Sequence, residues 1–168
     1  SEIDSYKRKI SGPLMDRIDM QINLSRVEFS ELKTKEKGES SAAIRERVVK
    51  ARLLQQERLE ALGMHCNAQM GRSEVVKYCQ LDAAAQNVME RYFNMLNLSA
   101  RSHDRILKVA RTIADLASSE NIEAVHLAEA IQLRTSVRPY GAGFEAGKFN
   151  ALRITDGSTQ SVFCCFLS

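Results

Sequence analysis

Residues 100–117, ARSHDRILKVARTIADLA, carry the pattern that most constrains the fold of this chain. Apolar side chains recur there at intervals of three and four residues, which places them on one face of an α-helix. They are Ile106, Val109, Ala110, Ile113 and Leu116. Ser99 precedes the run and can cap the helix. A helix with one apolar face must bury that face against other elements, so the stretch predicts a helical bundle.

Four further stretches are typical of helices. Ser40 or Ser41 can cap a long helix that ends at a break at Gly63, Ser73 can cap a short one, and Asp82 can cap a third. EAVHLAEAIQLR, residues 123–134, predicts the last helix. The positions expected to face inward are Ile44, Val48, Ala51, Leu54 and Leu62, then Val76 and Cys79, then Ala85, Val88, Met89, Tyr92 and Leu96, and finally Leu127, Ala128 and Ile131.

Residues 18–24 alternate apolar and polar side chains before these helices. The period of two, with Ile18, Met20, Ile22 and Leu24 on one side, predicts a strand with one buried face. The polar residues 25–40 predict a loop, and the residues after Arg134 show several glycines and no helical pattern. The predicted fold class is therefore mainly α, a bundle of about five helices preceded by one strand.

Composition excludes several classes of protein. Apolar residues make up 44% of the 168 and charged residues 27%, as in ordinary globular domains. The net charge of +3 permits contact with nucleic-acid phosphates without arguing for it. The four cysteines form neither CxxC pairs nor a dense disulfide pattern, so we expect no metal site and a reducing compartment. No apolar run reaches the roughly 20 residues of a membrane span, and we expect a cytoplasmic protein.

Five segments in order resemble one known family. They are YKRKISGPLMDRIDM (6–20), GESSAAIRERV (38–48), NAQM (67–70), LSARSHDRILKVARTIADL (98–116) and HLAEAIQLR (126–134). Together they are similar to the C-terminal region of magnesium chelatase-like AAA+ ATPases of the competence-protein type. The resemblance implies that a Lon-protease-like domain and an ATPase core precede this region in a longer protein.

The same resemblance divides the chain into three parts. Residues 1–37 would be the end of the AAA+ core, with the last strand of its sheet, and residues 38–134 the helical lid. Residues 135–168 would be a tail outside the family pattern. A strand at 18–24 without its sheet neighbours lacks partners for its backbone groups. We therefore expect it to pack on the helices, to pair with another chain or to be disordered.

Arg17 is the first candidate site residue. It lies between Asp16 and Asp19 in SGPLMDRIDM, a placement that by itself indicates a surface ion pair. The family resemblance implies instead an arginine finger, which acts in trans on the nucleotide of the neighbouring subunit in a ring. Asp16 and Asp19 would then orient the guanidinium or pair with the adjoining subunit.

The second candidate is a lid sensor for the ATP phosphates. The resemblance places it near the start of the helix at 100–117, where Arg101 fits best, with Arg105 and Lys108 as alternatives and Arg111 fitting less well. Ordinary solvated positions on a helix are the competing interpretation of these residues. Nothing in the residues decides between the candidates.

The resemblance also implies ATP and Mg²⁺ as cofactors of a longer, hexameric ATPase, with DNA as a partner and no membrane. This chain alone should not hydrolyse ATP, because the phosphate-binding loop and the carboxylates that hold Mg²⁺ belong to the core. Its own GAGFEAGKF, residues 141–149, lacks the spacing and the final Ser or Thr of such a loop. Two alternatives stay open: a helical module that binds nucleic acid or protein without an ATPase role, and a motor subunit that assists metal insertion.

Overall fold

The computed structural model describes residues 12–22 and 38–135. The chain forms two compact units: residues 12–22 and 48–135 belong to the first, and residues 38–47 to the second. The predictions for the tail after residue 135 and for the loop at 25–37 lie outside the described residues. None of the described helices is long and apolar enough to cross a bilayer.

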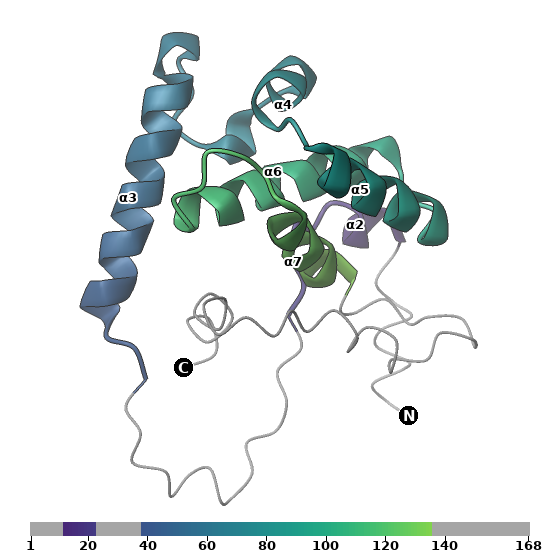
Figure 1. Ribbon diagram of the computed structural model, residues 1–168, viewed down its shortest axis with the longest axis horizontal. Helices are drawn as coiled ribbons and strands as arrows, with labels where there is room; N and C mark the ends of the chain where they lie inside the picture. The colour runs from purple at the N-terminus through teal and green to yellow at the C-terminus, as the bar shows by residue number, and fades with distance from the viewer. Residues whose placement is uncertain (1–11, 23–37, 136–168) are drawn as a thin grey trace, which may run out of the picture. The chain divides into compact units, whose positions relative to one another are not determined.

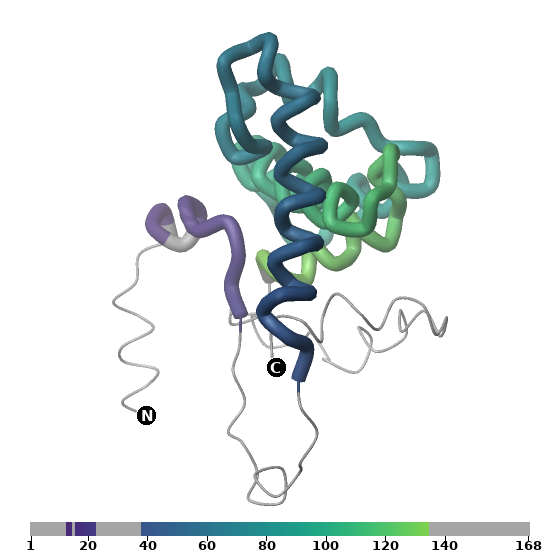
Figure 2. Tube along the Cα trace, turned by 90° about the vertical axis from the view of Figure 1, so that its left-hand side faces the viewer, coloured from purple at the N-terminus to yellow at the C-terminus, as the bar shows by residue number. Residues whose placement is uncertain are grey.

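The described residues are mainly helical, which confirms the predicted fold class (Figure 1). The α-helices are α2 (Gly12–Met15), α3 (Ser41–Leu59), α4 (Arg72–Tyr78), α5 (Ala83–Met95), α6 (Ala100–Leu116) and α7 (Ala124–Thr135). Two short 3₁₀ helices, η2 (Glu60–Leu62) and η3 (Asn67–Gln69), join α3 to α4. Figure 2 shows α3 as one uninterrupted helix.

Three of the predicted caps form as expected. The side chain of Asp82 accepts a hydrogen bond from the amide of Ala85, and Ser99 accepts one from Ser102. Ser40 accepts one from the amide of Ala43 at the start of α3. Each of these bonds satisfies an amide that the first turn of a helix leaves without a partner.

The cap predicted at Ser73 is wrong. Helix α4 begins at Arg72, two residues before the start that a cap at Ser73 implies, and the amide of Gly71 donates to Oε2 of Glu74 at 2.7 Å. The carboxylate of Glu74 reaches back over the first turn, which leaves Ser73 inside the helix.

The break predicted at Gly63 follows α3 and η2. Gly63 ends the helical path with a φ of 67°, a left-handed conformation that glycine adopts without strain.

The core lies between α6 and the helices around it. Helix α6 packs on α7 and on α4, and α5 packs on α7 (Figure 1). The buried apolar side chains of these helices and of the connections between them form one cluster with Leu59 and Met70: Val75, Cys79, Ala85, Met89, Leu98, Ile106, Leu107, Ala110, Ile113, Ala114, Ile122, Leu127, Ala130 and Ile131. The apolar stripe predicted for residues 100–117 is thus the centre of the core.

The inward face predicted for α3 is largely wrong. Val48, Leu54 and Leu62 are exposed. Ala51 is buried as predicted, and Gln55 and Leu59 are buried with it. These three lie four residues apart on one line, which is the narrow face that α3 buries within the first unit. Val76 of α4 is also exposed, and its neighbour Val75 is buried in its place.

The strand predicted at 18–24 is not formed in residues 18–22, and residues 23 and 24 lie outside the described part. Ile18, Met20 and Ile22 are 39%, 47% and 47% exposed, while Gln21 is buried. The amide of Gln21 donates to the carbonyl of Leu133 on α7 at 2.6 Å. A strand needs a neighbouring strand for its backbone groups, and within the described residues this segment meets helices instead. It packs on the helices, one of the three outcomes expected for it.

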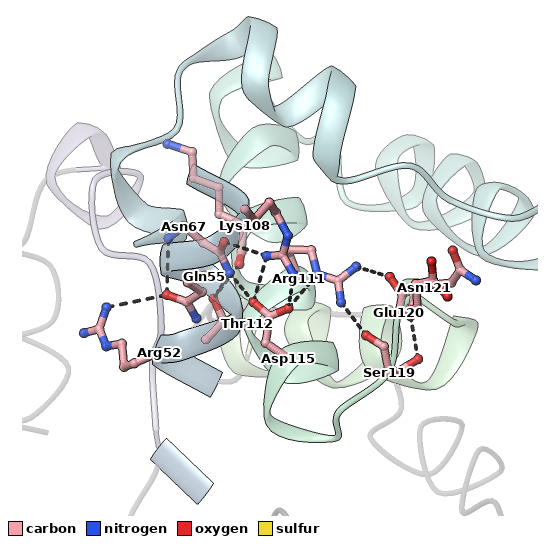
Figure 3. A network of polar contacts seen from close by, with 11 residues as sticks. Arg52, Gln55, Asn67, Lys108, Arg111, Thr112, Asp115, Ser119, Glu120 and Asn121 are labelled. Atoms are coloured by element: carbon pink, nitrogen blue, oxygen red, sulfur yellow. Dashed lines mark hydrogen bonds and ion pairs between the residues drawn. The ribbon is translucent and has the colours of Figure 1, made fainter. Parts of the chain in front are cut away.

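A buried carboxylate joins α3, η3 and α6 (Figure 3). Asp115 accepts two hydrogen bonds from the guanidinium of Arg58, at 2.6 and 3.0 Å, and one from Nε of Arg111 at 3.0 Å. Nδ2 of Asn67 donates to the same carboxylate at 2.8 Å and to Thr112 at 3.1 Å. The side chain of Asp115 is fully buried, so these bonds replace the water that the charge has lost.

Arg111 extends this network to the turn after α6. Its two terminal nitrogens donate to the carbonyls of Ser119 and Glu120, at 2.6 and 2.7 Å (Figure 3). The guanidinium therefore binds carbonyl groups of the turn that α6 itself cannot satisfy. Arg111 therefore stabilises the end of α6 and the turn that follows it.

Replacing Asp115 with Ala should lower the free energy of unfolding by about 3–5 kcal/mol, because two guanidinium groups would lose their buried partner. Urea titration measures the change. Asp104→Ala is the matched control: its partner Arg72 is 65% exposed in the side chain, and exposed pairs contribute about 0–1 kcal/mol. Equal losses for the two variants would contradict this account of the network.

Candidate functional site

The segment that carries Arg17 forms a tight turn. Helix α2 is a single turn, Gly12–Met15, and Pro13 suits it because the fixed φ of proline is compatible with the start of a helix. The amide of Arg17 then donates to the carbonyl of Leu14 at 3.0 Å. Arg17 lies directly after the helix and is exposed.

Asp16 is bound to helices α6 and α7 rather than to Arg17. Its Oδ1 accepts from the hydroxyl of Ser102 at 2.6 Å and from Nη2 of Arg134 at 3.0 Å. Arg134 also donates to the backbone carbonyls of Asp16, at 2.9 Å, and Ile18, at 2.7 Å. Ser102 lies in the first turn of α6 and Arg134 in the last turn of α7, so Asp16 joins the ends of two helices.

Asp19 is bound in the same way by a different arginine. Nη1 of Arg105 forms an ion pair with Asp19 and donates to the carbonyl of Arg17 at 2.8 Å. Within residues 12–22 and 38–135, no carboxylate pairs with the Arg17 guanidinium. The two acidic neighbours therefore hold the backbone of the segment through other arginines, and the local ion pair suggested by the sequence does not form.

The three lid-sensor candidates have different surroundings on α6. Arg105 is bound to the Arg17 segment, and Nζ of Lys108 donates to the carbonyl of Ala68 at 3.2 Å. Arg101 lies one turn before Arg105 and is exposed, and no partner for its guanidinium occurs in the described part of the chain. Arg17 and Arg101 are thus two exposed cations. The segment that carries Arg17 is bound to α6, the helix that carries Arg101, through Arg105 and Ser102.

These surroundings suit an anionic ligand more than a metal ion. An arginine without a carboxylate partner can bind phosphate oxygens through its planar set of donors. The residues that the structure describes contain no group of three His, Cys, Asp or Glu side chains able to hold a metal ion. Cys79 is buried, which raises the pKa of its thiol to about 11 and disfavours the thiolate that binds metals.

The residues that the sequence did not reveal are Ser102 and Arg134. Both are polar side chains on the apolar face of a helix: Ser102 is four residues before Ile106, and Arg134 is three residues after Ile131. Both are buried. A charged or hydroxyl side chain in such a register indicates a buried partner from elsewhere in the chain, but the pattern does not say which residue that is.

Two family models match this chain. Residues 38–134 match the family model described as the C-terminal part of magnesium chelatase subunit ChlI. Residues 1–32 match the model described as magnesium chelatase subunit ChlI. The chain belongs to the magnesium chelatase ChlI family. All five segments noted in the sequence fall within the two matched ranges, which confirms the resemblance.

Several relatives align with most of this ChlI-family chain. Competence protein ComM of Haemophilus influenzae is 39% identical over 138 residues, which is 82% of the chain and 26% of ComM. The uncharacterized protein YifB of Escherichia coli K12 is 38% identical over 130 residues, 77% of the chain and 25% of YifB. An uncharacterized protein of Mycobacterium tuberculosis H37Rv is 30% identical over 129 residues. The chain spans about a quarter of the length of the relatives it matches.

The environment of Asp16 predicts a pH dependence of stability. The hydrogen bond from Ser102, aided by the charge of Arg134 and opposed by partial burial, lowers the pKa of Asp16 below its usual 3.8. Asp16 therefore adds stability above pH 3.8, and this contribution is lost as the pH falls through the lowered pKa of the folded state. Asp16→Asn should remove that part of the acid-induced loss.

Urea midpoints measured from roughly pH 5 to pH 2 would test this linkage. The Asn variant should be less stable than the parent at pH 5 and approach it at the acid end. Asp104→Asn, at an exposed pair, serves as control. An unchanged difference between Asp16→Asn and the parent at every pH would show that the carboxylate of Asp16 is not the group responsible.

Proposed function

We propose that this chain is the C-terminal part of a ring-forming AAA+ ATPase in which Arg17 acts in trans as an arginine finger. One observation carries the proposal: the Arg17 guanidinium is exposed without a carboxylate partner in the described residues, while other arginines bind both of its acidic neighbours. A surface arginine between two carboxylates would ordinarily pair with one of them. Here the backbone is held and the guanidinium is available to a ligand from outside.

The proposed role rests on charge stabilisation. A guanidinium near the γ-phosphate of a nucleotide bound by the neighbouring subunit offsets the negative charge that develops on the transferred phosphoryl group. Arg101, the exposed cation in the first turn of α6, is proposed as the lid sensor that contacts the ATP phosphates. Bound ATP supplies the phosphoryl group, and Mg²⁺ would be held by carboxylates of the ATPase core, outside the described residues.

The exposed side of residues 18–22 supports a place at the end of that core. Ile18, Met20 and Ile22 are two residues apart and all exposed, so their apolar side chains are available for contact with the ATPase core. In this proposal, residues 1–37 complete the ATPase core and residues 38–134 form the lid. Residues 135–168 are a tail, and the chain alone does not hydrolyse ATP.

The substrate of the ring is proposed to be DNA. The 39% identity to a competence protein is the support for this choice. The proposed protein is a cytoplasmic, hexameric motor that moves DNA during uptake or recombination. The match to a magnesium chelatase subunit favours a second candidate, a motor that assists metal insertion. Stimulation of ATP hydrolysis by DNA distinguishes the two roles, because only the first requires contact with DNA.

Arg17→Ala in the longer protein, with its ATPase core, should lower ATP turnover by about 10³- to 10⁵-fold, the range for arginine fingers. The same replacement of the exposed Arg91 on α5 should leave turnover unchanged. Action in trans predicts a further result in mixed rings. Arg17→Ala subunits should regain activity beside subunits that keep Arg17 but cannot bind ATP. Normal turnover of the Arg17→Ala protein would refute the proposed role.

A further inference from the structure

We infer that Arg134, at the end of α7, is a positioning residue that holds the backbone of Arg17 for its action on the nucleotide. This inference rests on the proposed function of Arg17. It concerns a residue more than a hundred positions away in the sequence, whose side chain is buried. Arg134 itself does not contact the nucleotide in this account.

The hydrogen bonds of Arg134 surround Arg17 on both sides. One guanidinium donates to the carbonyl of Asp16, at 2.9 Å, and to the carbonyl of Ile18, at 2.7 Å. These are the residues directly before and after Arg17. The carbonyl of Arg17 itself accepts from Arg105 at 2.8 Å. Three successive carbonyl groups are therefore bound by two arginines of the helical unit.

The side chain of Asp16 supplies the charge that makes this burial of Arg134 favourable. Its carboxylate accepts from Nη2 of Arg134 at 3.0 Å, and the same nitrogen donates to the hydroxyl of Ser102 at 3.0 Å. A buried cation without such a partner would be strongly destabilising. The position of Arg134 in the last turn of α7 also places its charge near the negative end of the helix dipole.

The chemistry of these bonds requires arginine. Its planar guanidinium presents donors in fixed directions, so that one side chain can reach two carbonyls and a carboxylate at once. Lysine keeps the charge but concentrates its donors on a single nitrogen. Arg134→Lys should therefore preserve the ion pair with Asp16 and loosen the carbonyl groups on either side of Arg17.

Amide hydrogen exchange on the 168-residue chain tests the structural part of the inference. Arg134→Lys should speed exchange in residues 12–22, including the Arg17 amide, by about tenfold, with exchange in α5 unchanged. Arg91→Lys makes the same chemical change at an exposed position and should alter neither region. Unchanged exchange in residues 12–22 of the Arg134→Lys chain would overturn the inference.

A second variant distinguishes loosening of residues 12–22 from general unfolding. Ser102→Ala removes one hydrogen bond to Asp16 and one acceptor for Arg134 without removing a charge. It should also speed exchange in residues 12–22, by a smaller factor than Arg134→Lys. Thermal unfolding of each variant shows whether the helices remain folded. A folded Ser102→Ala chain with parental exchange in this segment would count against the inference.

Mixed rings of the longer protein test the functional part. The reference ring combines Arg17→Ala subunits, which bind ATP, with subunits that keep Arg17 but cannot bind ATP. Adding Arg134→Lys to the Arg17-donating subunits should lower turnover by about 100-fold, the effect of misplacing a group by about 1 Å. Adding it to the ATP-binding subunits should leave turnover near that of the reference ring.

The two arrangements separate positioning from stability. Equal losses in both would mean that Arg134 acts on folding in general, and the inference would fail. An inactive reference ring without Arg134→Lys would instead refute the trans role of Arg17. In that case hydrogen exchange still decides whether Arg134 holds the segment.

Discussion

A buried guanidinium needs hydrogen-bond acceptors within the protein. For Arg134, residues 16 and 18 supply them. Its hydrogen bonds to Asp16 and Ile18 fix residues 16–18 against the ends of α6 and α7. The carboxylate of Asp16 is bound to Arg134 and Ser102 rather than to Arg17. The Arg17 guanidinium is exposed beside it.

Helix α6 joins this junction to the rest of the domain. Near its start, Ser102 contacts Asp16 and Arg134, and near its end, Asp115 binds Arg58 and Arg111. The apolar side chains between these two positions form the centre of the core. One helix therefore carries both the packing that stabilises the unit and the polar groups that fix the segment before it. The proposed finger and the proposed lid sensor both depend on this helix for their position.

The sequence predicted best those features that depend on neighbouring residues. The periodicity of residues 100–117 and the caps at Asp82 and Ser99 depend on contacts within one helix or its first turn, and the structure confirms them. The strand at 18–24 was predicted from alternation alone. Alternation shows which side chains share a face, but a strand also needs a neighbour, which the described residues do not supply.

Long-range polar contacts were the part that the sequence did not predict. The exposure of Leu54 and the burial of Gln55 on α3 depend on which side of the helix meets Asn67, and the apolar positions of that helix do not reveal it. The burial of Arg134 and Arg111 was not expected, because charge is usually exposed. The acceptors of Arg134 lie in residues 16–18, and those of Arg111 are Asp115 and the turn after α6, so only the fold identifies these partners.

A structure of the longer protein as an ATP-bound ring would test the central claim most directly. The account predicts that the Arg17 guanidinium lies within hydrogen-bonding distance, about 2.7–3.2 Å, of the γ-phosphate held by the neighbouring subunit, with Asp16 still bound to Arg134. An Arg17 side chain paired with a carboxylate of its own subunit and distant from the nucleotide would contradict it.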